Sequence, residues 1–241
     1  MLKQIYRILY HISFNKIKIF KSLYKQGKIF KNNSIIIIDG NKEKKLNFFS
    51  KLFGRLDIEF MGENNTVYIK KPTRIKHLTI RFFGNNNKVY FDKNASGKFY
   101  FSLHLDNNNI HLGQRVEVSS FSATLHGDNL TIGNNCMFSH NIDCWTDGHS
   151  VIDNNTKELL NKPHHNIKIG DHVWIGANVV LLKKTKIPSN SIVAHSSVVT
   201  KAFEEENIVI AGNPAKIVKK GINWNGLKPE KYNKENADFS F

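Results

Sequence analysis

Residues 169–179 read IGDHVWIGANV, and they open a run in which an aliphatic residue returns at every sixth position. The members of this run are Ile169, Ile175, Leu181, Ile187, Val193 and Val199. Neither a helix nor an ordinary strand has that period. It is typical of a β-solenoid, in which three hexapeptides form one triangular coil. A chance series of buried strands in a sandwich is the alternative, and six successive matches at one interval make it the weaker reading.

The same region carries four motifs in a fixed order. They are TDGHS at 146–150, IGDHVWIGANV at 169–179, SVVTK at 197–201 and AGNPAK at 211–216. In these motifs the chain resembles the hexapeptide-repeat acyltransferases, and around residues 146–150 the sugar and polysaccharide O-acetyltransferases among them. The resemblance covers residues 130–220. It implies an all-β, left-handed parallel β-helix and transfer of acetyl from acetyl-CoA.

Composition sets broad limits on the partners and the compartment. The chain has 241 residues, is 40% hydrophobic and carries a formal charge of +15. This length supports a substantial core. The charge predicts anionic partners without choosing among a membrane surface, a nucleotide-bearing cofactor, an acidic polymer and nucleic acid. Two cysteines are too few for a disulfide framework, and no signal peptide is evident. We therefore expect a cytoplasmic protein.

The first segment, residues 1–33, contains eight basic residues and no acidic one. Apolar residues recur in it at helical spacing, as at Ile5, Ile8, Leu9 and Ile12. A basic amphipathic helix of this kind suits the inner face of a membrane. Packing on the end of the solenoid or on a neighbouring subunit is an equally good reading.

Residues 34–126 alternate short apolar stretches with asparagine-rich turns. Each turn is followed by a similar strand, and these strands begin near Val67, Val89, Ile110 and Leu130, which are 22, 21 and 20 residues apart. Asparagine tolerates left-handed backbone conformations, so the repeat has a physical basis. We predict irregular coils of one domain at 34–220, although a separate β-sandwich remains open.

Two other segments depart from the period. Residues 150–166 are polar and are predicted to form a loop excluded from the coil, and by resemblance this loop reaches an adjacent subunit. Residues 221–241 are short of aliphatic side chains and are predicted to form a short helix or a frayed tail, with Trp224 and Phe239 as the candidates to dock it.

His149 is the candidate catalytic base. Attack by a sugar hydroxyl on a thioester requires a group that takes the hydroxyl proton, and a neutral imidazole suits this task near pH 7. Asp147 is a candidate partner that fixes the imidazole, and a backbone carbonyl is the alternative. The chain lacks a Gly-x-Ser-x-Gly motif, which favours direct attack on acetyl-CoA over an acyl-enzyme.

The remaining site residues follow from the resemblance. Trp174 matches a tryptophan beside the acceptor, and His165 lies on the loop that walls the acceptor site. The backbone N–H of Ala177 matches an oxyanion donor. The predicted acetyl-CoA-binding residues are Ala177, Ala194, Ser196, Thr200, Lys201, Asn213, Pro214, Lys216 and Lys219. The family's Gly-Ala-Gly is replaced by Ala194-His195-Ser196, which affects how CoA fits.

A metal site is not predicted. Cys136, His140, Cys144 and His149 are close in sequence, but a six-residue period turns Cys144 inward and Cys136 and His140 elsewhere. Zinc-dependent carbonic anhydrases of this fold use a His-x4-His pair, which the chain lacks.

The sequence thus predicts an acetyl-CoA-dependent O-acetyltransferase acting on a surface polysaccharide, such as capsule, or on its precursor. By resemblance it works as a homotrimer. The alternatives are an N-acetyltransferase for a nucleotide-linked amino sugar and a non-catalytic solenoid that binds membrane or acidic polymer. Nucleic acid is not expected as a partner, because no recognition motif accompanies the charge.

Overall fold

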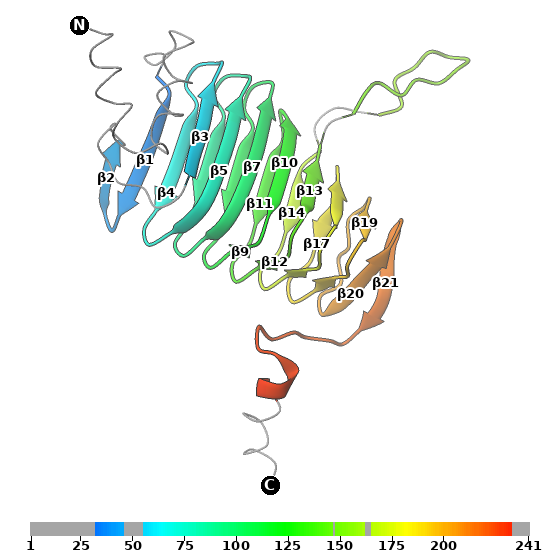
Figure 1. Cartoon of the computed structure of the whole chain (residues 1–241). Coiled ribbons are helices and arrows are strands. Elements are labelled where there is room, and N and C mark those ends of the chain that lie inside the picture. The colour runs from blue at the N-terminus through cyan, green and yellow to red at the C-terminus, as the bar shows by residue number, and fades with distance from the viewer. Residues whose placement is uncertain (1–31, 46–54, 147, 162–164, 233–241) are drawn as a thin grey trace, which may run out of the picture.

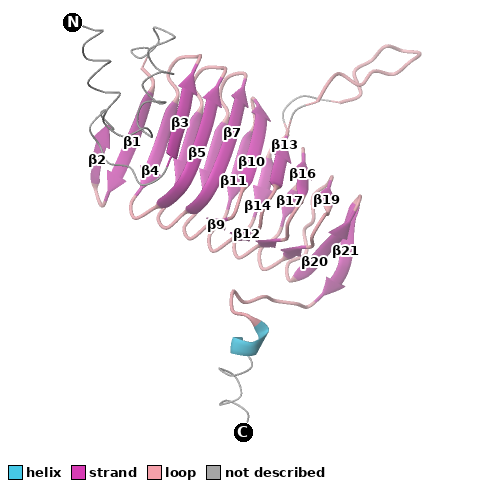
Figure 2. Cartoon of the chain, viewed as in Figure 1, coloured by secondary structure: helices cyan, strands magenta, loops and turns pink. Residues whose placement is uncertain are grey.

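The computed structural model describes residues 32–45, 55–146, 148–161 and 165–232. The predicted amino-terminal helix lies outside these residues, as does the end of the tail at 233–241. Figure 1 shows one continuous stack of coils that runs from β1 to β21. Within these residues almost every element is a strand, and one helical turn occurs at 229–232 (Figure 2).

The strands form three faces, and every pairing between successive coils is parallel. Face 1 contains β1 (Ser34–Asp39), β4 (Thr66–Lys70), β6 (Lys88–Phe91), β8 (Asn109–Leu112), β11 (Asn129–Ile132), β14 (Ile167–Ile169) and β17 (Lys186–Ile187), with β2 (Lys42–Lys45) antiparallel at its edge. Face 2 contains β3 (Arg55–Phe60), β5 (Arg74–Phe82), β7 (Ser96–His104), β10 (Phe121–His126), β13 (Ile142–Trp145), β16 (Val180–Leu182) and β19 (Val198–Val199). Face 3 contains β9 (Glu117–Val118), β12 (Met137–Phe138), β15 (Trp174–Ile175), β18 (Ile192–Val193), β20 (Ile208–Gly212) and the antiparallel β21 (Ala215–Lys220).

The register confirms the predicted repeat. On face 1, Val67 pairs with Val89, Val89 with Ile110, and Ile110 with Leu130. The described residues between 34 and 126 therefore stack as coils of the same solenoid and do not form a separate sandwich. The first of these coils are irregular, as predicted. β5 and β7 are nine-residue strands, and β7 pairs with both β9 and β10, whereas the later coils divide into separate short strands.

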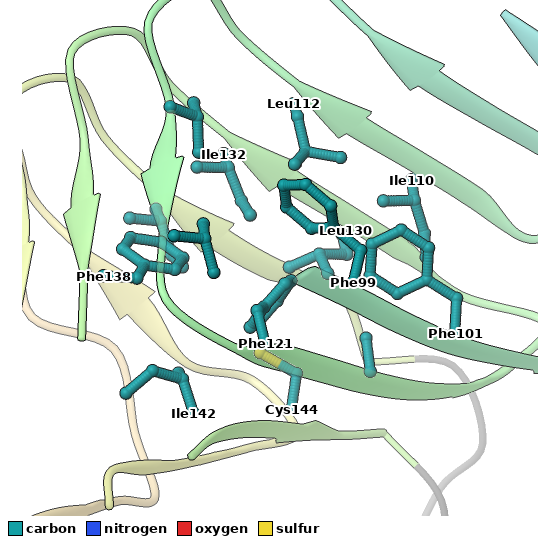
Figure 3. Packing of buried hydrophobic residues seen from close by; sticks show 14 of the residues in the cluster. Phe99, Phe101, Ile110, Leu112, Phe121, Leu130, Ile132, Phe138, Ile142 and Cys144 are labelled. Atoms are coloured by element: carbon teal, nitrogen blue, oxygen red, sulfur yellow. The ribbon is translucent and has the colours of Figure 1, made fainter. Parts of the chain in front are cut away.

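The core changes along the stack. In the longer first coils the interior is filled by phenylalanines such as Phe99, Phe101 and Phe121, and Phe138 continues the row into the first six-residue coil, as Figure 3 shows. The ring centroids of Phe121 and Phe138 lie 5.5 Å apart in an edge-on arrangement, which aromatic pairs favour. The shorter later coils are filled by the six aliphatic residues of the hexapeptide run, all of which are buried. Coil length and side-chain volume thus decrease together.

Buried amides line the corner between face 2 and face 1. The backbone N–H of Asn65 donates to the side-chain oxygen of Asn33, and Asn87 and Asn108 continue the pattern at 2.9 and 2.7 Å. Asp128 takes the next place, since its N–H donates to Asn108 Oδ1 at 3.0 Å. Each amide satisfies backbone groups that the turn would otherwise leave buried without partners. We refer to these five residues as the asparagine ladder.

Candidate active site

The excluded loop leaves the coil at the corner of the asparagine ladder. It follows β13, projects from the stack as a thin hairpin in Figure 1, and contains one isolated bridge between Ile152 and Leu159. Its return is anchored where the N–H of His165 donates to Asp128 Oδ1 at 2.6 Å. The last step of the asparagine ladder therefore fixes the base of the hairpin.

The side chain of His149 is exposed at the beginning of this hairpin. Its backbone carbonyl accepts a hydrogen bond from Asn161 Nδ2 at 2.7 Å, and the Asn161 amide oxygen accepts one from the N–H of Val151 at the same distance. One amide thus holds both strands of the hairpin around His149, while the imidazole remains exposed to solvent. Asp147, the predicted partner of His149, lies outside the described residues.

A cation lies close to this segment. A β-carbon built on Gly148 would come within 3.5 Å of Lys183 Nζ, which belongs to the next coil. The proximity of Lys183 was not foreseen from the sequence, because the inserted hairpin separates the two residues by more than one hexapeptide coil. An ammonium group here favours negative charge near His149.

Trp174 lies on face 3, where it pairs with Met137 on one side and with Ile192 on the other. Its side chain is 41% exposed. The carboxy-terminal tail passes nearby, and the ring of Trp224 lies 6.3 Å from that of Trp174. His165, the other predicted acceptor residue, is partly buried at the far corner, so the chain does not bring it next to Trp174.

Several of the predicted cofactor residues lie together at the corner between face 3 and face 2. The N–H of Ser196 donates to the carbonyl of Ala177 at 2.9 Å. The buried hydroxyl of Ser197 donates to the carbonyl of Ala194 at 2.7 Å and accepts the N–H of Gly212 at 3.3 Å. These bonds stack three successive coils into one edge, which we call the serine corner.

The other predicted cofactor residues are divided between two places. Asn213 and Pro214, joined by a cis peptide bond, form the turn next to the serine corner. Lys216 and Lys219 follow on β21 with exposed side chains. Thr200 and Lys201 lie past the opposite end of β19, where the Lys201 ammonium is 5.4 Å from the ring centre of Phe203.

Within one chain, His149 and the serine corner do not meet. They lie on opposite sides of face 2, and the four residues of β13 alone span about 13 Å at the usual rise of a strand. His149 and the serine corner of one chain are therefore separated by at least the width of face 2.

The cysteines are buried in the coil. Burial raises the pKa of the Cys136 thiol to about 12, and burial together with the negative charge of Asp143 raises the pKa of Cys144. The expectation that Cys136 does not face the core was wrong, because each hexapeptide turns two residues inward, as Val173 and Ile175 also show. In the part of the chain that the structure describes, no group of three His, Cys, Asp or Glu side chains is placed to hold a metal. Nor does any helix within those residues have the length and apolar character needed to cross a membrane.

Comparison with known proteins identifies the repeat. The family model of bacterial transferase hexapeptide repeats (six repeats) matches residues 166–201. Residues 166–201 therefore match six repeats of the hexapeptide type. The match covers β14, β15, β16, β17, β18 and β19, which build the serine corner and carry Trp174.

Two curated relatives of this chain are named as sugar O-acetyltransferases. The polysialic acid O-acetyltransferase of Escherichia coli O1:K1 / APEC is 32% identical over 47% of this chain and 37% of its own length. The galactoside O-acetyltransferase of Escherichia coli (strain K12) is 34% identical over 45% of this chain and 53% of its own length. The chain thus spans about half of the length of one of these relatives and less than half of the other.

A solved structure gives a longer match. The polysialic acid O-acetyltransferase OatWY is 27% identical and superposes with a TM-score of 0.71 over 87% of this chain and 96% of that chain. The likeness includes the irregular first coils, which the repeat family does not cover. It confirms the left-handed β-helix expected from the sequence.

Proposed function

We propose that the protein is an acetyl-CoA-dependent O-acetyltransferase that modifies a sugar hydroxyl of a bacterial surface polysaccharide or of its precursor. The observation that carries this proposal is the likeness to OatWY over 87% of the chain. The two curated relatives support the same chemistry, since both are named as O-acetyltransferases of sugars. An excess of positive charge, +15 overall, suits an acidic glycan and the phosphates of CoA.

His149 acts in this proposal as the general base. The imidazole takes the proton of the acceptor hydroxyl while its oxygen attacks the thioester carbonyl carbon of acetyl-CoA. The tetrahedral intermediate then breaks its carbon–sulfur bond, and the departing thiolate takes the proton from the imidazolium. A positioned base of this kind contributes about 10² to 10⁴ in rate. The Asn161 amide holds the main chain at His149, and Asp147 is the proposed orienting partner.

Acetyl-CoA is placed along the serine corner. The N–H of Ala177 faces the developing oxyanion, and Ala194, Ser196, Asn213 and Pro214 form the edge that the pantetheine arm follows. The cations of Lys216 and Lys219 on β21 are exposed and suit the CoA phosphates. Thr200 and Lys201, which lie past the other end of β19, would contact cofactor only if it extends across face 2.

The assembly proposed is a homotrimer with each site between two copies. The separation of His149 from the serine corner supports it, and so does the hairpin. Its apolar side chains are unusually exposed, at 55%, 53%, 51% and 61% for Val151, Ile152, Leu159 and Leu160. Packed against a neighbouring copy, they would be removed from water. We place this assembly in the cytoplasm, with residues 1–33 either contacting the inner face of the membrane or packing on the trimer.

The proposal is tested with purified full-length protein, acetyl-CoA and a panel of de-O-acetylated surface polysaccharides that includes polysialic acid. Acceptor-dependent thiol release, with new O-acetyl signals in the NMR spectrum of the glycan, is the expected result. Transfer to an amino group would identify an N-acetyltransferase. Absence of both thiol release and CoA binding would favour a non-catalytic solenoid.

A further inference from the structure

The carboxy-terminal tail crosses face 3 as a strap. It is fixed first at Asn207, which makes two hydrogen bonds with Ile222. The Ile222 N–H donates to the Asn207 carbonyl at 3.0 Å, and Asn207 Nδ2 donates to the Ile222 carbonyl at 3.1 Å. Further along, Gly226 lies beside Met137 of β12. The tail therefore runs back over several coils, as its course from β21 in Figure 1 shows.

Trp224 is the centre of this strap. Its indole Nε1 donates to the carbonyl of His172 at 2.8 Å, and its ring stacks on the His172 imidazole with a centroid distance of 4.4 Å and an interplanar angle of 16°. Two independent contacts thus set the position and the plane of the indole. Such a fixed aromatic ring loses little conformational freedom when a ligand binds.

The indoles of Trp224 and Trp174 form an open corner. Their centroids are 6.3 Å apart and their planes are inclined by 45°, so neither ring covers the face of the other. Trp174 keeps 41% of its surface exposed, and Trp224 is only partly buried. The sequence motifs contain only Trp174, so the second ring comes from a segment about fifty residues away.

We propose that Trp224 is a specificity-determining residue that binds the acceptor sugar together with Trp174. The proposal rests on the O-acetyltransferase function proposed above. The two indole faces hold the apolar C–H face of one pyranose ring, and the pair sets which glycan is accepted. Trp224 does not take part in the proton transfer.

The surroundings suit a sugar better than the nucleotide end of CoA. The adjoining corner carries neutral and acidic hydrogen-bonding groups: Asn134 Nδ2 donates to Asp171 Oδ1 at 3.2 Å, and His172 Nδ1 and Asn190 Oδ1 are 3.2 Å apart. These groups match sugar hydroxyls. Phosphates require cations, and Lys216 and Lys219 lie on β21, three strands and about 14 Å from β15.

The alternative is that Trp224 only fastens the tail. Trp224→Phe separates the two roles, because it removes the donor to the His172 carbonyl and keeps an aromatic face, whereas Trp224→Ala removes both. A fastening role predicts that both variants lower the melting temperature and leave substrate constants unchanged. The matched control is Tyr100→Ala on β7. This variant removes an aromatic side chain of similar exposure, 38%, from another face.

The experiment measures KM for glycan and for acetyl-CoA with the full chain, and glycan binding without acetyl-CoA. The chain has three tryptophans, so Trp145→Phe leaves only Trp174 and Trp224 as fluorescent reporters of binding. In this background, Trp224→Ala should raise Kd and KM for the glycan about tenfold, Trp224→Phe about threefold, and neither should raise KM for acetyl-CoA more than about twofold.

Each outcome separates this inference from the proposed function. Suppose that the wild type turns over and that Trp224→Ala either keeps the wild-type Kd and KM for the glycan or raises only the KM for acetyl-CoA. Either result would overturn the role of Trp224 and leave the transferase proposal intact. Glycan quenching that depends on Trp224 without any thiol release would support the sugar site and reject the transferase. Neither quenching nor turnover across the panel would reject both.

Discussion

The carboxylate of Asp128 accepts a hydrogen bond from the backbone N–H of His165, with 2.6 Å between the two atoms. Asp128 is the last member of the asparagine ladder, and His165 ends the hairpin that begins near His149. A row of buried polar groups inside the solenoid thus continues directly into the base of the proposed catalytic loop. The stability of the coils and the position of the loop are therefore coupled through one side chain.

Asp128→Ala is expected to loosen the hairpin. The His165 N–H loses its acceptor, and an unpaired group of this kind costs about 1–3 kcal/mol. Trypsin cleavage after the exposed Lys157 should become about tenfold faster, and kcat should fall by a similar factor because His149 is less well placed. Asp128→Asn keeps an oxygen acceptor and is the control. Wild-type cleavage and kcat in Asp128→Ala would contradict the coupling.

Asn108→Ala tests the asparagine ladder itself. The Asn108 side chain is fully buried, accepts the N–H groups of Gly127 and Asp128, and donates to the carbonyl of His104 at 2.7 Å. Its loss should lower the free energy of unfolding in urea by about 2–4 kcal/mol. Asn109→Ala removes the exposed neighbour and should cost less than about 1 kcal/mol. Equal losses of unfolding free energy in the two variants would show that a buried ladder asparagine stabilises the fold no more than an exposed asparagine does.

The two thiols give a pH-dependent prediction. Burial raises the pKa of Cys136 to about 12, and it also raises the pKa of Cys144, whereas a thiol in the unfolded chain titrates near 8.5. Above pH 8.5 the unfolded state therefore releases protons that the folded state keeps, so the free energy of unfolding should decrease as pH rises from 8.5 to 10.

Thiol labelling checks the same point directly. At pH 8 a thiol reagent should modify neither cysteine in the folded protein and both after unfolding, since the thiolate is the reactive form. The double variant Cys136→Ser/Cys144→Ser should lose the part of the alkaline slope that the thiols cause. Fast labelling of the folded protein would show that the core opens far more readily than its burial implies.

The sequence was sufficient to predict the coil because inward-facing positions recur locally. Ile175 and Val193 are separated by three six-residue repeats. Both are buried, and they pair with each other on face 3. The turn role of asparagine was also readable, and Asn86 has the expected left-handed φ of 57°. The burial of its neighbour Asn87 could not be predicted in this way, because a polar side chain becomes buried only when the next coil stacks on it.

The site was less accessible to sequence reasoning. The motifs pointed to His149 and Trp174, but the tail position of Trp224 depends on a hydrogen bond to His172 that spans 52 residues. The only signal was an isolated tryptophan in an otherwise polar tail. The distance between His149 and the serine corner likewise follows from the coil geometry, since motif order does not say which corner a residue occupies.

The most direct test of the account is acceptor-dependent thiol release from acetyl-CoA by the wild type and by His149→Ala. His111→Ala, an exposed histidine on β8 remote from the hairpin, is the control. The account predicts a fall in kcat of about two orders of magnitude or more for His149→Ala, unchanged melting temperature, and wild-type rates for His111→Ala. A His149→Ala protein that folds normally and transfers acetyl at the wild-type rate would contradict it.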